Sequence, residues 1–202
     1  MEFFRRAAGH PAKLGILAGT FNPPTRAHFG LVRAAGTAID EILFALPKVF
    51  PHKRYVGAGV ETRLNMLNLA AEAAELPVPW SIASTERGLF IDIARECREP
   101  YGPHCRFLFL CGRDAADRIV TWDYGKPGAF REKLQEFELL VFPRQGVYKP
   151  PVEIRDRVHS LPLDSGFDAI SSTKVRGRVA KGGHWEHLVP PAIEGLVRST
   201  YK

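Results

Sequence analysis

An apolar run, a glycine turn and a histidine follow one another in Gly15-Ile16-Leu17-Ala18-Gly19-Thr20-Phe21-Asn22-Pro23-Pro24-Thr25-Arg26-Ala27-His28. The apolar run at 14–18 predicts a buried strand, and the packing spacing within 29–38 predicts a helix after the turn. In an open parallel sheet, ligands bind at the carboxyl ends of the strands. Backbone N–H groups of the turn and the positive end of the helix would form an anion site there, to which His28 can add a hydrogen bond.

Strands and helices alternate along the rest of the chain. Apolar runs bounded by turn residues predict buried strands, and apolar residues at helical spacing predict helices. This alternation indicates an α/β fold of the Rossmann-like type, an open parallel sheet with helices on both faces. The predicted strands are 41–46, 80–83, 106–111 and 138–142, and the predicted helices are about 60–75, 89–98, 171–181 and 190–200.

The length of 202 residues, with 45% hydrophobic residues, suits one domain with a substantial core. No repeat or long linker divides the chain, so we expect a single domain over 1–202 with a C-terminal helical portion from about residue 171. Prolines and mixed polarity in 146–166 allow a loop or short elements. The sequence leaves the oligomeric state open, a homo-oligomer included.

The charge balance points to an anionic partner. The chain has 28 Lys and Arg against 22 Asp and Glu, a formal net charge of +6. Positive charge attracts nucleic acid and nucleotide phosphates alike. The basic residues form only short clusters, at 48–54 and 174–178, without the interleaved aromatic residues of a single-strand binding platform. We therefore expect phosphate pockets and no nucleic acid partner.

Cysteines and apolar runs indicate the compartment. Cys97, Cys105 and Cys111 form no C-x-x-C pair, and three cysteines cannot all pair within one chain, so a reducing compartment is the simplest inference. The first residues have too short an apolar run for a signal peptide, and no stretch approaches the roughly 20 apolar residues that span a bilayer. We expect a cytoplasmic protein without a membrane partner.

A second helix start that suits anions lies in Ile170-Ser171-Ser172-Thr173-Lys174-Val175-Arg176. Its hydroxyl groups can cap the helix or hold phosphate oxygens, and Arg176 lies one turn into the helix. Taken singly, a glycine turn, a histidine at a helix start and a hydroxyl cap are more often structural. Two such helix starts in one small α/β domain suggest a triphosphate held from two sides.

Together these two segments resemble the nicotinate or nicotinamide mononucleotide adenylyltransferases, nucleotidyltransferases with a T/H-x-x-H motif and an I-S-S-T-x-x-R motif. The resemblance spans about 14–181. Further segments follow in the family's order: Pro51-His52-Lys53, Glu61-Thr62-Arg63-Leu64-Asn65-Met66-Leu67, Gly112-Arg113-Asp114, Thr121-Trp122 and Phe142-Pro143-Arg144.

The resemblance implies roles for individual residues. His28, Arg176 and Lys53 would be catalytic, and Trp122 would stack on the pyridine ring, although packing in a core or lid suits a tryptophan nearly as well. The acceptor nucleotide would be bound by Asn22, Lys53, Trp122 and Arg144. ATP would be bound by Gly19, Thr20, Phe21, Thr25, His28, Gly112, Asp114, Ile170, Ser171, Ser172, Thr173 and Arg176.

The implied reaction is attack by the 5′-phosphate of a pyridine mononucleotide on the α-phosphorus of ATP. No protein nucleophile is needed, because a phosphate monoester is largely dianionic at neutral pH, with a second pKa of about 6. We expect Mg²⁺ to arrive with ATP and name no protein metal ligand, because the motifs contain no carboxylate cluster. Two alternatives are an adenylyl- or cytidylyltransferase with another phosphate acceptor and a nucleotide sensor without turnover.

Two further features concern selectivity and metal. Ile91 stands where the bacterial enzymes of this family usually have a threonine, so the sequence favours the nicotinate form only modestly, with dual use close behind. His184 and His187 are three residues apart and could share a helical face. Because a third ligand is not evident and structural zinc normally takes four, we interpret them as surface histidines.

Overall fold

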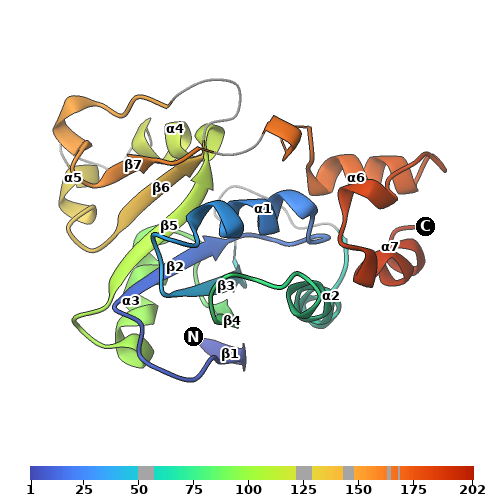
Figure 1. The fold of residues 1–202 in the computed structure, drawn as a ribbon, viewed down its shortest axis with the longest axis horizontal. Helices are drawn as coiled ribbons and strands as arrows, with labels where there is room; N and C mark the ends of the chain where they lie inside the picture. Colours follow the sequence, from blue (N-terminus) through green and yellow to red (C-terminus); the bar gives the residue numbers. More distant parts are fainter. Residues whose placement is uncertain (50–56, 122–128, 143–147, 163–164, 168) are drawn as a thin grey trace.

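The computed structural model describes all residues except 50–56, 122–128, 143–147, 163–164 and 168 (Figure 1). Its described strands form one sheet in the order β1-β4-β3-β2-β5-β6-β7, in which β1 pairs antiparallel with β4 and all other neighbours are parallel. The strands are β1 (Glu2–Arg5), β2 (Lys13–Ala18), β3 (Glu41–Pro47), β4 (Trp80–Thr85), β5 (Arg106–Gly112), β6 (Glu138–Phe142) and β7 (Val158–Ser160).

Helices cover both faces of this sheet, which confirms the predicted α/β architecture. One hydrophobic cluster packs α1, α2, α6 and α7 on one face, and a second packs α3, α4 and α5 on the other. The helices are α1 (Arg26–Ala35), α2 (Val60–Glu72), α3 (Phe90–Tyr101), α4 (Arg113–Thr121), α5 (Ala129–Lys133), α6 (Ser172–Val179) and α7 (Glu194–Thr200).

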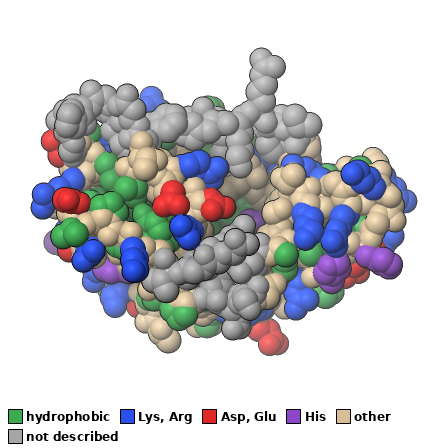
Figure 2. All heavy atoms as spheres, turned by 90° about the horizontal axis from the view of Figure 1, so that it is seen from above, with side chains coloured by type: hydrophobic (Ala, Val, Ile, Leu, Met, Phe, Trp, Pro, Cys, Tyr) green, Lys and Arg blue, Asp and Glu red, His purple; other side chains and the backbone are tan. Residues whose placement is uncertain are grey.

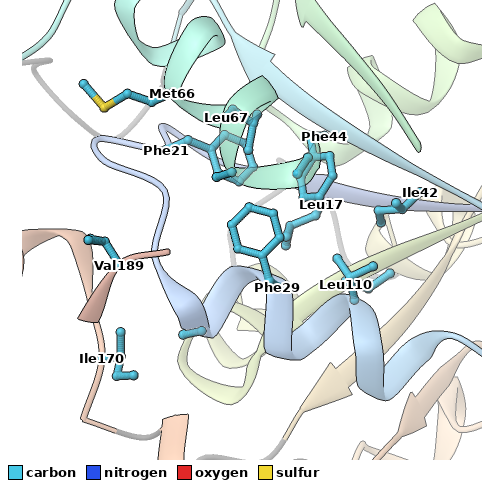
Figure 3. Close-up of a cluster of buried hydrophobic side chains, with 14 of the residues drawn as sticks. Leu17, Phe21, Phe29, Ile42, Phe44, Met66, Leu67, Leu110, Ile170 and Val189 are labelled. Atoms are coloured by element: carbon cyan, nitrogen blue, oxygen red, sulfur yellow. The ribbon is translucent and has the colours of Figure 1, made fainter. Parts of the chain in front are cut away.

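The strands serve both clusters because successive side chains point to opposite faces. In β5, Leu108 and Leu110 belong to the first cluster, whereas Phe107 and Phe109 belong to the second. Burial on both faces explains why the strands appear in the sequence as continuous apolar runs. In Figure 3, side chains from several elements of the first cluster converge around Phe29 of α1.

The topological switch point of the sheet lies between β2 and β5. From β2 the chain moves through β3 to β4 on one side and then returns to pair β5 on the other side. In the register, Ile16 pairs with Phe109, so Gly19 and Gly112 each lie three residues beyond this pair at the carboxyl ends. In open α/β sheets this is where ligands bind.

Several boundaries and elements differ from the predictions. Helix α1 begins at Arg26, three residues before the predicted start, because Thr25 is its N-cap. The last α-helix, α7, starts only at Glu194, after a 3₁₀ turn at Pro191–Ile193. The sequence pattern missed α4 and the two edge strands β1 and β7, which are only four and three residues long. No described helix is long and apolar enough to span a bilayer.

Candidate active site

The first motif forms a loop, residues 19–25, between β2 and α1. The N–H of Gly19 donates to Ala45 O at 3.0 Å, which ties the start of the loop to β3. Phe21 lies in the left-handed region with φ of 45°, an unfavourable conformation for an aromatic residue. Its fully buried ring packs on the rings of Phe44 and His28. The ring centroids of Phe21 and His28 are 5.0 Å apart. Packing thus holds a strained backbone at the ligand edge of the sheet.

The hydrogen bonds of Thr25 fix the orientation of His28. The backbone N–H of Thr25 lies 2.9 Å from His28 Nδ1, and Thr25 Oγ1 lies 2.8 Å from the same nitrogen. A backbone N–H can only donate, so Nδ1 is the acceptor and the proton of the neutral imidazole lies on Nε2. Thr25 itself is 0% exposed. It therefore orients His28, and its predicted contact with ATP stays a prediction.

A buried arginine, Arg63 of α2, holds the loop from a second side. Only 3% of this residue is exposed. Its Nη1 donates to Thr20 O at 2.9 Å and its Nε to Ala58 O at 3.1 Å. Arg63 lies in the segment 61–67 that follows the family's order, but no role was predicted for it. Helical spacing could have predicted its burial, because Arg63 stands three residues after Val60 and four before Leu67, on the apolar side of the helix.

The second motif lies directly against the first. Ser171 caps α6 by accepting from Lys174 N at 3.2 Å. Ser172 Oγ donates to Pro23 O at 2.8 Å, and Arg176 Nη1 donates to Asn22 O at 2.5 Å. The structure therefore brings the two predicted anion sites together, and the guanidinium of Arg176 carries further N–H donors.

The remaining residues of the second motif divide by exposure. Thr173 is exposed on the first turn of α6, whereas Ile170 is buried in the first hydrophobic cluster, where Figure 3 shows it with Val189. Figure 2 shows Lys, Arg and His side chains gathered on the part of the surface built by α6 and α7. This part of the chain contributes Lys174, Arg176, Arg178, Lys181, Arg198 and Lys202. A positive surface thus adjoins the two motifs.

Gly112 and Asp114 lie at the end of β5, on the other side of the switch point. Gly112 pairs with Phe142 of β6, and Asp114 is exposed in the first turn of α4. An exposed carboxylate beside a strand end can accept hydrogen bonds from ribose hydroxyls. The arrangement is compatible with the predicted contact to adenosine.

Three predicted site residues, Lys53, Trp122 and Arg144, lie outside the described residues. Their roles stay predictions. Ile91, which stands where a threonine was expected, is buried in the second hydrophobic cluster as part of α3.

His184, His187 and the buried cysteines lie apart from the two motifs and form no metal-binding group in the part of the chain that is described. His184 and His187 are exposed, and Arg178 Nη1 lies 2.7 Å from His184 O and 3.2 Å from His187 Nε2. Among the described residues, no three His, Cys, Asp or Glu side chains form a group that could hold a metal ion. Burial raises the pKa of the Cys111 thiol to about 12, so this thiol is protonated at neutral pH.

Known proteins are similar to this chain in sequence and in fold. The family model for cytidylyltransferase-like proteins matches residues 16–178, which include both motifs. A probable nicotinate-nucleotide adenylyltransferase from Moorella thermoacetica is 31% identical over 94% of this chain and 90% of its own length. One from Gloeobacter violaceus is 32% identical over 92% of this chain and 93% of its own.

A solved structure agrees in fold at lower sequence identity. The nicotinic acid mononucleotide adenylyltransferase of Plasmodium falciparum, complexed with NaAD, has a TM-score of 0.73 at 18% identity, covering 93% of this chain and 95% of that one. The sequence matches and the two joined motifs agree with the resemblance drawn from the sequence. The chain belongs to the cytidylyltransferase-like family and, within it, to the nicotinate-nucleotide adenylyltransferases.

Proposed function

We propose that this chain transfers the adenylyl group of ATP to the 5′-phosphate of nicotinate mononucleotide, forming a dinucleotide and pyrophosphate in NAD biosynthesis. The observation that carries the proposal is the joining of the two motifs, with Arg176 Nη1 2.5 Å from Asn22 O and His28 oriented by Thr25. His28 and Arg176, two donors for phosphate oxygens, thereby lie at one loop, at the switch point of the sheet.

The reaction needs positioning and charge stabilisation more than proton transfer. An oxygen of the acceptor phosphate forms a bond to the α-phosphorus, and the bond from that phosphorus to the oxygen leading to the β-phosphate breaks. The leaving pyrophosphate takes the electron pair. His28 would donate from Nε2 to a phosphate oxygen, and Arg176 would stabilise the charge that develops during transfer.

Magnesium enters this proposal as part of the substrate. It would be bound mainly by the triphosphate oxygens, since Mg²⁺ commonly binds through substrate phosphates. Lys53, Trp122 and Arg144 would bind the acceptor nucleotide, as the resemblance implies. We expect the reaction to take place in the cytoplasm.

The acceptor is the least constrained part of the proposal. A carboxylate and an amide on the pyridine ring differ by a full charge, so discrimination requires nearby hydrogen-bond donors or basic groups. Ile91 has an apolar side chain that is 5% exposed and cannot supply such a donor. Selection would then fall to backbone N–H groups or basic residues, and we expect nicotinate mononucleotide to be preferred over nicotinamide mononucleotide by a modest factor.

The test is pyrophosphate release from ATP and Mg²⁺ with a panel of acceptors. The panel contains nicotinate mononucleotide, nicotinamide mononucleotide and 4′-phosphopantetheine, with a reaction lacking acceptor as the control. We expect the highest kcat/KM with nicotinate mononucleotide. A strong preference for the amide or for phosphopantetheine would overturn the acceptor assignment. ATP binding without turnover for any acceptor would instead support a nucleotide sensor.

A further inference from the structure

The end of the chain reaches back to the loop 19–25. Tyr201 follows α7, and its partly buried ring packs against the first hydrophobic cluster. Its hydroxyl lies 2.5 Å from Asn22 Oδ1. These residues are 179 positions apart in the sequence, so the contact joins the chain terminus to the motif after the first parallel strand.

The side chain of Asn22 is held in one orientation. Ala58 N donates to its Oδ1 at 3.3 Å, and a backbone N–H requires an acceptor, so the oxygen and not the amide nitrogen faces Ala58. The Tyr201 hydroxyl must then donate to the same oxygen. Only 3% of Asn22 is exposed. On the other side, a Cβ at Gly57 would lie 2.3 Å from Asn22 Nδ2, so the side chain fills a tight slot.

The main chain of Asn22 is tied to the same C-terminal part of the molecule. Arg176 of α6 donates to Asn22 O, while Tyr201 donates to the side chain of the same residue. Asn22 follows Phe21, whose backbone is strained, and precedes the helix start that carries His28. Movement of Asn22 would therefore shift the backbone at the predicted anion site and change the position of His28.

We infer that Tyr201 is a positioning residue for adenylyl transfer, which acts through Asn22 to fix the phosphate-binding loop. This inference rests on the proposed function. Its physical basis is preorganisation, since donors that are already in place need not reorganise when charge develops on the substrate. A hydroxyl at the end of the chain would thus contribute to turnover without contacting the substrate.

The test uses Tyr201→Phe, which keeps the ring and removes only the hydroxyl. We expect kcat to fall and the Kd for ATP to rise, each by about three- to tenfold, the range that corresponds to one hydrogen bond. The matched control is Tyr101→Phe, which removes a hydroxyl that donates to Glu41 Oε1 at 2.9 Å, at the opposite end of the sheet. We expect this control to lower Tm without changing kcat or the ATP Kd.

A double-mutant cycle separates positioning from general stability. In an Asn22→Ala background, Tyr201→Phe should change neither kcat nor the ATP Kd further, because the partner of the hydroxyl is gone. An equal loss in both backgrounds, or no loss in the parent background, would overturn the inference. If the parent binds ATP but turns over no acceptor, the proposed function fails, while the cycle in ATP Kd still decides the role of Tyr201.

Discussion

The two ends of the parallel strands both contain buried charged residues, Glu41 and Glu138 at one end and Arg63 at the other, but they use them differently. At the amino end, Glu41 accepts from Ser81 at 2.6 Å and from Tyr101 at 2.9 Å. At the same end of the sheet, in β6, Glu138 accepts three hydrogen bonds from Arg106 and lies 2.9 Å from His159. At this end the side chains form hydrogen bonds with one another, and several of these bonds join neighbouring strands.

At the carboxyl end, the side chains bond to the main chain of one loop. Arg63, Ser172 and Arg176 donate to the carbonyl oxygens of Thr20, Pro23 and Asn22. These three bonds go to carbonyl oxygens and so hold the backbone of the loop without using its N–H groups, of which those of Gly19 and Thr25 donate to Ala45 O and His28 Nδ1. The comparison suggests that the amino end serves stability, whereas the carboxyl end fixes a backbone for binding.

The largest effect on activity should come from His28→Ala. This change removes the donor that Thr25 orients, and the loss of one preorganised donor to a developing oxyanion costs a factor of about 100 or more in kcat. Pyrophosphate release measures kcat, and circular dichroism with a thermal melt checks that the fold is intact. A variant as active as the parent would show that the first motif does not have the role proposed here.

The two ends of the sheet can be tested with the same chemical change, Gly57→Ala at the carboxyl end and Gly102→Ala at the amino end. Both glycines have positive φ, 136° and 82°, so both substitutions strain the backbone by about 1 kcal/mol. A Cβ at Gly57 would clash with Asn22, whereas no heavy atom lies within 4 Å of a Cβ at Gly102, which ends α3 near the amino end.

We expect Gly57→Ala to lower kcat/KM about tenfold, since displacement of Asn22 moves the loop. Gly102→Ala should lower only Tm. The two variants are compared by kinetics and thermal melts at the same protein concentration. Equal losses of kcat/KM would mean that the clash at Asn22 has no special effect on the site.

The substitution Glu138→Gln tests the amino end of the sheet through the pH dependence of the free energy of unfolding. Burial disfavours the charged form of Glu138, but the hydrogen bonds from Arg106 and His159 outweigh it and hold the pKa of this carboxyl below its ordinary value. A carboxyl whose pKa is lower in the folded state stabilises the fold above its unfolded pKa, near 4.5, and loses this contribution as the pH falls through the folded pKa.

We therefore expect Glu138→Gln to lower the free energy of unfolding by about 1 to 2 kcal/mol at pH 7, a modest figure because the Arg106 side chain is 56% exposed. The difference from the parent should shrink below pH 4.5, and kcat should not change. Urea unfolding at several pH values measures this. A difference that stays constant down to pH 3 would contradict the assignment of the shift to Glu138.

The sequence predicted the sheet and its ligand edge because burial on both faces leaves continuous apolar runs such as Leu139 to Phe142. It did not predict the edge strand β1, whose four residues are mostly exposed and carry no such pattern. In the candidate site, the motif that holds Gly19 and His28 could be predicted to lie between a strand and a helix because it is local, and the structure places it there. Tyr201 could not, since its partner Asn22 is 179 residues away and only the docking of α7 brings them together.

Among the variants at the carboxyl end of the sheet, the smallest loss of activity should come from Ser172→Ala, with Ser199→Ala as its control. Both hydroxyls donate to backbone carbonyls, Ser172 to Pro23 O at 2.8 Å and Ser199 to Leu196 O at 3.0 Å. The first bond joins α6 to the loop 19–25, whereas the second stays within α7. One neutral hydrogen bond contributes about 1 kcal/mol, so each loss is small in stability.

The position of the carbonyl group that accepts the hydrogen bond then determines which of the two substitutions lowers kcat/KM. Without the Ser172 hydroxyl, Pro23 is less firmly held, although Arg176 still binds the neighbouring carbonyl of Asn22. We therefore expect Ser172→Ala to lower kcat/KM by only about threefold, and Ser199→Ala to leave it unchanged. If the two variants had the same kcat/KM, the tie from α6 to the loop would contribute to folding alone, and the contrast between the two ends of the sheet would rest on Arg63, Arg176 and Tyr201.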